Sequence, residues 1–167
     1  MVYYTLHQDK IIYHHDDKCS FREMDNPDDD DIEKTISNFK ELYKWDGMFD
    51  LLEVRRRMRK RDRLFILYFD GQVCGHMWFS KHPEKMGLIS EMVLPSQSMY
   101  CYNVFVDKRI HDKSWCDSSY QVGSVCKFIF SEGYHQIHLY TDDWNESAMS
   151  FFKRIGFEED DWTKIMF

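Results

Sequence analysis

Residues 145–157, N-E-S-A-M-S-F-F-K-R-I-G-F, decide the fold of this chain. Asn145 is suited to cap a helix, because its side-chain oxygen can accept from the free backbone N–H groups of the first turn. Apolar residues follow at helical spacing and form one face: Ala148, Phe151, Phe152 and Ile155. Gly156 supplies the left-handed residue that ends many helices. The stretch therefore predicts a short amphipathic core helix that leads into a strand.

A second helical pattern lies upstream, between Ser118 and Gly133. Its apolar positions are Tyr120, Val122, Val125, Phe128 and Ile129. The segment K-S-W-C-D-S, residues 113–118, leads directly into this helix. A helix N-terminus offers unpaired backbone N–H groups, which suit a phosphate. The segment is therefore a candidate phosphate loop, or else an ordinary loop in which Asp117 or Ser118 caps the helix.

Together these segments carry a family resemblance. The pattern N-x-x-A-x-x-F-[YF]-x-x-x-G-F resembles the last helix of GNAT-superfamily acyltransferases. In that family the preceding helix begins at a pyrophosphate-binding loop, [QR]-x-x-G-x-[GA], and the usual spacing from Gly133 places this loop on residues 113–118. The loop has lost its glycines, small residues stand where they are expected, and Lys113 replaces the arginine or glutamine. The resemblance covers residues 19–167 and leaves residues 1–15 outside.

The order of the predicted elements fits this family. We expect strands at 19–24, 64–69, 73–79, 99–106, 136–140 and 163–167, and helices at 31–43, 49–60, 118–132 and 145–155. Hairpins come first and crossovers later, which predicts an α/β fold with a mixed, mostly antiparallel sheet flanked by helices. The resemblance implies that this sheet is splayed at the cofactor site.

Three further segments complete the prediction of a single domain over residues 1–167. Residues 1–15 are expected to form a hairpin or an added edge strand. Pro83 to Gly87 marks a turn, and Leu88 to Leu94 is either a further strand or an irregular crossing.

Composition limits the class of protein. A chain of 167 residues with 43% hydrophobic residues is long and apolar enough for a globular core. Five cysteines without a C-x-x-C pair favour reduced thiols and a cytoplasmic location, and no apolar run is long enough to span a membrane. The formal charge of −7 argues against nucleic acid and favours a cationic partner. The basic run over residues 55–63 carries an apolar stripe, so we interpret it as a solvated helix face. No Cys/His set predicts a metal site.

The resemblance also implies where the cofactor, acetyl-CoA or another acyl-CoA, lies. The pantetheine arm pairs with the strand before the loop, so Val104, Phe105 and Val106 offer backbone groups to it. Asn145 and Phe152 face its other side. The pyrophosphate is expected on the loop and the start of the helix, at Lys113, Ser114, Trp115, Cys116, Asp117 and Ser118.

The catalytic residues are less well defined. Direct attack by an amine on a thioester needs a deprotonated amine, a polarised carbonyl and a proton for the departing thiolate. The tyrosine that usually supplies this proton in the family is replaced by Phe152. Titratable candidates near the expected site are Glu91, Tyr102 and Tyr140. His76 and His82 are further candidates that can equally be structural.

Two functions remain open. The first is an acyl-CoA-dependent N-acyltransferase, which most simply moves acetyl to the primary amine of a small molecule, a protein lysine or an N-terminus. The second is a GNAT-fold protein that has lost catalysis and serves as a binding or regulatory module. The missing loop glycines and Phe152 favour the second function, whereas family members that work without the tyrosine favour the first.

Overall fold

The computed structural model describes residues 1–43, 49–83, 94–107, 109 and 118–160. Its strands are β1 (Val2–His7), β2 (Cys19–Met24), β3 (Arg63–Phe69), β4 (Gln72–Ser80), β5 (Ser98–Val106), β6 (Gln136–Thr141) and β7 (Glu158–Glu159). Its helices are α1 (Asp30–Tyr43), α2 (Leu51–Arg59), α3 (Ser118–Ser131) and α4 (Glu146–Ile155), with a short 3-10 turn at Gln8–Lys10. The predicted helices and strands within the described residues are present, with boundaries that differ by a few residues.

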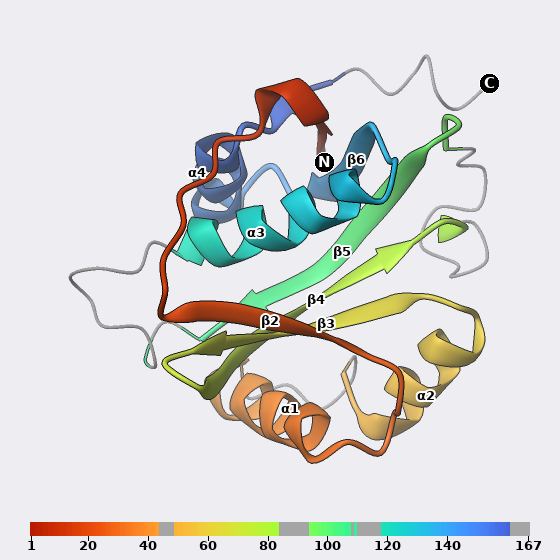
Figure 1. The fold of residues 1–167 in the computed structure, drawn as a ribbon, viewed down its shortest axis with the longest axis vertical. Coiled ribbons are helices and arrows are strands. Elements are labelled where there is room, and N and C mark those ends of the chain that lie inside the picture. Colours follow the sequence, from red (N-terminus) through yellow and green to blue (C-terminus); the bar gives the residue numbers. More distant parts are fainter. Residues whose placement is uncertain (44–48, 84–93, 108, 110–117, 161–167) are drawn as a thin grey trace.

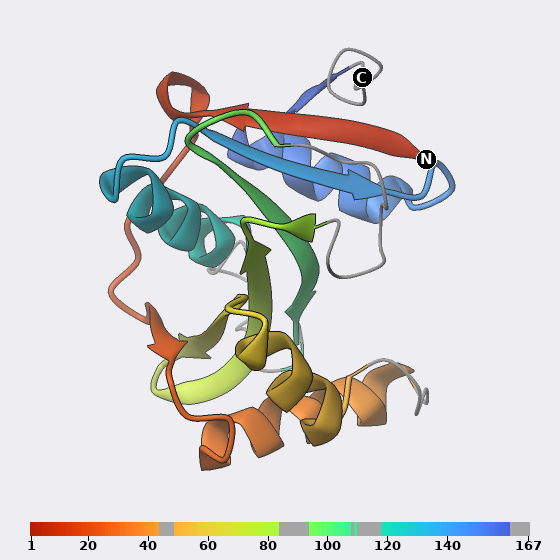
Figure 2. The same ribbon diagram turned by 90° about the vertical axis from the view of Figure 1, so that its right-hand side faces the viewer.

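The strands form one sheet in the order β2-β3-β4-β5-β6-β1-β7. Among the described strands, β5 and β6 form the one parallel pair, and every other neighbouring pair is antiparallel. Helices α1 and α2 cover one face of the sheet, and α3 and α4 cover the other (Figures 1 and 2). The predicted fold class, a mixed and mostly antiparallel sheet flanked by helices, is confirmed.

Because helices cover both faces, the central strands are apolar on both sides. Residues 64–67 of β3 are all fully buried. Phe65 and Leu67 belong to the core beneath α3 and α4, whereas Leu64 and Ile66 belong to the core beneath α1 and α2. A continuous apolar run rather than a strict alternation is the pattern expected of such a strand.

The N-terminal strand lies deeper in the sheet than the sequence predicts. β1 pairs with β6 over its whole length, from Val2↔Thr141 to His7↔Gln136, and β7 lies on its other side. Residues 1–15 therefore contribute an added strand, as one of the two alternatives expected, but β7 takes the edge position and the hairpin is not formed. β7 was not predicted. The strand expected at 163–167 lies outside the described residues. So do residues 84–87 of the expected turn and residues 88–93 of the segment expected at 88–94.

The longest described helices, α1 and α3, each have 14 residues. Within the described part of the chain, no helix has both the length and the apolar content that a bilayer crossing requires.

Candidate active site

The central strands separate at one point in the sheet. β5 and β6 pair at Ser98↔Gln136, Met99↔Ile137 and Tyr100↔His138, and the pairing ends there. Beyond Tyr100, β5 keeps its antiparallel partner β4 as far as Gly75↔Val106. Among the described strands, none pairs with the β6-facing edge of β5 over its last residues, where backbone polar groups need other partners.

A β-bulge marks the same part of β5. The register between β4 and β5 shifts by one residue between His76 and Trp78, opposite Asn103, which has a positive φ of 50°. Gly75 pairs with Val106 just beyond this bulge, and a Cβ at position 75 would overlap the Phe105 carbonyl oxygen. Only glycine permits so close an approach of the two strands. A bulge bends its strand and increases the local twist, which moves β5 away from β6.

α4 closes the other side of the opening, and it forms for the reasons that the sequence suggests. The Asn145 side chain accepts a hydrogen bond from the Ala148 backbone N–H at 3.1 Å. Gly156 ends the helix with a φ of 104°. Phe152 and Ile155 face the core, which fixes the rotation of the helix about its axis.

A cavity of about 190 Å³ lies at the opening, and we name it the splay cavity. Its described lining comes from α1, β5 and the N-terminal parts of α3 and α4: Tyr43, Val104, Val106, Ser118, Asn145, Ser147, Ala148, Phe151 and Phe152. α1 and α4 lie on opposite faces of the sheet, so residues from both faces meet where β5 has left β6. The volume is smaller than that of a site for a whole drug-sized ligand, and it suits a narrow part of one.

Five of the predicted cofactor-binding residues meet in this lining. They are Val104, Val106, Ser118, Asn145 and Phe152. The Phe105 side chain points to the other face of the sheet, where it contacts Phe39 at 5.3 Å between ring centroids. Residues Lys113, Ser114, Trp115, Cys116 and Asp117 of the predicted loop lie outside the described residues.

The predicted catalytic tyrosines lie elsewhere. The Tyr102 hydroxyl donates to Asp62 Oδ2 at 2.6 Å in a buried contact, and burial is the main cause of the raised pKa of Tyr102. The Tyr140 ring stacks on Tyr100 with the centroids 6.2 Å apart. Neither Tyr102 nor Tyr140 is among the described residues that line the splay cavity. Glu91 lies outside the described residues, so its role stays a prediction.

A buried charged cluster was missed in the sequence. Burial raises the pKa of Asp62, while hydrogen bonds from Ser80 and Tyr102 act in the opposite direction. The Arg57 guanidinium lies 5.1 Å from the ring centroids of both Trp78 and Tyr102. The predicted solvated helix face is thus wrong for Arg57, which is only 5% exposed. The position of Arg57 midway along the apolar stripe of α2 was the signal in the sequence that its side chain is buried.

The two histidine candidates differ in their surroundings. His76 is fully buried and stacks on Phe49 at 4.0 Å, and its Nδ1 lies 3.0 Å from the Thr35 hydroxyl. Burial lowers the pKa of His76 to about 3, so the ring is neutral near pH 7. The backbone N–H of His82 donates to the Ser80 hydroxyl. Neither residue lines the splay cavity within the described chain, and we expect His76 to be structural.

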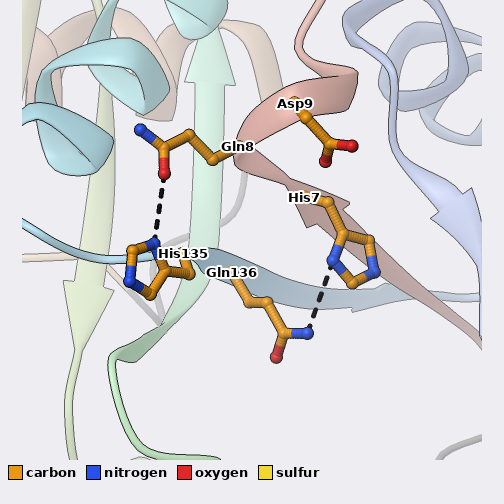
Figure 3. A pocket seen from close by; sticks show the side chains of 5 residues that line it. All are labelled: His7, Gln8, Asp9, His135 and Gln136. Carbon is orange, nitrogen blue, oxygen red and sulfur yellow. Dashed lines mark hydrogen bonds between the residues drawn. The ribbon is translucent and has the colours of Figure 1, made fainter.

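A second hollow lies where β1 ends and β6 begins (Figure 3). Its side chains hydrogen-bond to one another: His135 with Gln8 at 3.1 Å and Gln136 with His7 at 3.4 Å. Across the described residues, no three His, Cys, Asp or Glu side chains gather in a way that would hold a metal ion. The mutual pairing leaves this hollow a weaker candidate than the splay cavity.

Solved structures share this architecture at low sequence identity. An aminoglycoside acetyltransferase from an uncultured soil metagenomic sample has a TM-score of 0.59 and 11% identity, covering 83% of this chain and 87% of that chain. Aminoglycoside N-acetyltransferase AAC(6')-Iy in complex with CoA has a TM-score of 0.60 and 16% identity, covering 86% and 90%. A GNAT-family acetyltransferase from Streptococcus pneumoniae has a TM-score of 0.58 and 12% identity, covering 86% and 87%.

The fold is therefore that of the N-acetyltransferase class. The model of the acetyltransferase (GNAT) family matches residues 15–157, and the chain belongs to this family. A search of curated proteins gives no significant match. The predicted family, fold class and N-acetyltransferase class are confirmed, whereas the acyl donor, the acceptor and the mode of attack stay predictions.

Proposed function

We propose that this protein transfers an acetyl group from acetyl-CoA to a primary amine by direct attack of the amine on the thioester. The observation that carries the proposal is the splay cavity. There, residues from both faces of the sheet meet beside an edge of β5 that no described strand pairs with. An extended arm with amide groups, such as pantetheine, supplies the hydrogen-bond partners that this edge lacks. Membership of the GNAT family, and a structural neighbour in complex with CoA, support acetyl-CoA as the donor.

Individual residues of the cavity suit such an arm. Val104 and Val106 both line the cavity and offer apolar side chains to the arm. The Phe105 carbonyl between them lies on the β4 side, next to Gly75. The Asn145 side-chain oxygen is occupied by the helix cap, so its amide nitrogen is the group that can donate to a carbonyl of the arm. Ser118 begins α3, whose first backbone N–H groups suit the pyrophosphate.

The acceptor is proposed from charge. The chain carries a formal charge of −7, which attracts cationic amines and raises their local concentration. Two of the structural neighbours are aminoglycoside acetyltransferases. Aminoglycosides are polyamines, so they are the first acceptors to screen. A protein lysine or N-terminus is the other class of primary amine to test.

The experiment is calorimetric titration of the purified chain with acetyl-CoA, beside the variants Ser118→Glu and Ser131→Glu. Ser118 lines the cavity at the start of α3, whereas Ser131 ends the same helix. We expect saturable binding that Ser118→Glu weakens at least tenfold and that Ser131→Glu leaves unchanged, because like charges at the pyrophosphate repel. Absence of binding to the unmodified chain would refute the proposal. Binding of acetyl-CoA without turnover of any amine would favour the alternative, a GNAT-fold protein that has lost catalysis and serves as a binding or regulatory module.

A further inference from the structure

The splay cavity contains an ionisable group that no family pattern in the sequence indicates. Among the described residues that line it, Tyr43 is the one that carries a phenol hydroxyl. The other polar members are Ser118, Ser147 and Asn145, and the rest are apolar. Phe152, at the position where the family usually carries its proton donor, has no proton to give. A phenol-bearing residue thus lines the same cavity from α1 instead of from α4.

Ring contacts hold Tyr43 at the end of its helix. Its ring centroid lies 4.9 Å from that of Phe39, one turn earlier in α1, and 5.9 Å from that of Phe105 in an edge-on contact. Arg109 ties α1 to the end of β5, because its guanidinium pairs with Glu41 at 2.9 Å and with Asp107 at 2.8 Å. The end of α1 is therefore fixed against the strand that borders the cavity.

Exposure of Tyr43 fits a group that must exchange protons. The residue is 59% exposed and also belongs to the cavity lining. A proton donor in acyl transfer has to reach the departing sulfur and then regain a proton from water before the next turnover. A buried phenol such as that of Tyr102, which donates a hydrogen bond to Asp62, has much less access to water.

We propose that Tyr43 protonates the CoA thiolate as it leaves, and this role rests on the acetyl transfer proposed above. The amine nitrogen forms a bond to the thioester carbonyl carbon, and the carbon–sulfur bond breaks with its electron pair on sulfur. The phenol proton of Tyr43 passes to that sulfur, which yields CoA thiol. The surplus proton of the new amide nitrogen leaves to solvent, and the tyrosinate takes a proton from water.

Tyr43→Phe tests this role, because it removes the hydroxyl and keeps the ring contacts with Phe39 and Phe105. We expect unchanged affinity for acetyl-CoA and a kcat about 100-fold lower, since general acid catalysis is commonly of this size. Tyr43→Phe with Phe152→Tyr should recover part of the kcat, because a phenol then enters from α4. Tyr13→Phe is the matched control, since its hydroxyl lies near His15 Nδ1 at the surface.

A second measurement needs no acceptor. The thiol of bound CoA is titrated by the ultraviolet absorbance of its thiolate in the unmodified chain and in each variant. A phenol that donates to the sulfur stabilises the thiolate, so Tyr43→Phe should raise the pKa of the bound thiol by about one unit. Tyr13→Phe should leave this pKa unchanged.

The outcomes separate the two proposals. An unmodified chain that binds neither acetyl-CoA nor CoA overturns the proposed function, and the role of Tyr43 falls with it. Normal binding, with Tyr43→Phe equal to the unmodified chain in the thiol pKa, overturns the role of Tyr43 alone. A raised thiol pKa in Tyr43→Phe and its reversal by Phe152→Tyr support the role whether or not the acceptor has been found.

Discussion

Acidification should destabilise this protein through two buried histidines, His76 and His138. His138 is 1% exposed, and its Nδ1 lies 3.0 Å from the Thr5 hydroxyl, which in turn donates to Asp160 Oδ2 at 2.8 Å. Burial lowers the pKa of His138 to about 4, although the Asp160 charge acts against this and His7 acts with it. The corresponding pKa of His76 is about 3. Both rings are therefore neutral in the folded protein at pH values where the unfolded chain protonates them.

The size of the effect follows from these values. When the pKa of a base is lower in the folded state, the unfolded chain binds more protons, so the free energy of unfolding falls as the pH falls below the unfolded pKa of 6.5. Between about pH 7 and about pH 5 each histidine lowers the free energy of unfolding of the protein by about 2 kcal/mol, and the pair lowers it by about 4 kcal/mol. Domains of this size commonly have only about 5–15 kcal/mol to lose.

The chosen pH range isolates the histidines from the most strongly shifted carboxylate. Hydrogen bonds from Arg56 and Arg57 lower the pKa of Glu53 to about 2. Because that pKa is lowered, the stability that Glu53 contributes is present above its ordinary value of 4.5 and is lost only as the pH falls from there toward about 2. It therefore stays in place at about pH 5.

Urea unfolding at both pH values measures the loss, in the unmodified chain and in two variants. His138→Gln keeps a donor for the Thr5 hydroxyl but cannot protonate, so it should lose about 2 kcal/mol less than the unmodified chain over this range. His135→Gln replaces an exposed histidine just before β6 and should behave like the unmodified chain. If His138→Gln loses as much stability as the unmodified chain, the reasoning about a buried neutral ring at this position fails.

Four further substitutions test the packing of the sheet and helices by thermal or urea unfolding. Gly75→Ala should lower the free energy of unfolding by about 3 kcal/mol, because its Cβ would overlap a carbonyl of β5. The control is Gly123→Ala in α3, where the nearest atom is 3.5 Å from the added Cβ; it should change this free energy by less than about 1 kcal/mol. Equal effects would contradict the close approach at Gly75. Asn145→Ala should cost about 1 kcal/mol through loss of the α4 cap, and no change would mean that the cap is dispensable. Tyr102→Phe should cost about 2 kcal/mol by removing a donor from buried Asp62, whereas a neutral result would show that water replaces the hydroxyl.

The parts of the fold that sequence could predict are those fixed by short-range chemistry. Asn145 and Gly156 act within one helix, and both take the cap positions that their side chains favour. β3 and β4 are joined by Asp70 and Gly71, a turn pair that specifies a hairpin. The place of β1 was mispredicted because its partner, β6, is more than a hundred residues away, and nothing local distinguishes an inner strand from an edge strand.

The candidate site is only partly visible in the sequence for a related reason. Val104, Asn145 and Phe152 could be indicated through a family pattern, and the structure brings them together. Tyr43 could not, because in the sequence it is simply an aromatic residue at helical spacing after Phe39. Arg57 was assigned to a solvated helix face although it lies along the apolar stripe of α2, and nothing local in the sequence indicates that Asp62 is buried.

The opening in the sheet is where local and global preferences conflict, and this is the strongest argument that it serves a ligand. β5 is an aromatic and β-branched strand that would gain hydrogen bonds by pairing with β6 along its whole length. Instead Asn103 adopts a positive φ and position 75 is a glycine, which has no side chain to pack, and β5 bends away from β6. Each feature costs stability, because a positive φ strains a residue with a side chain and glycine weakens a strand. A partner that supplies the missing backbone hydrogen bonds would recover this cost, so acetyl-CoA should stabilise the folded chain more than its charge contacts alone would suggest.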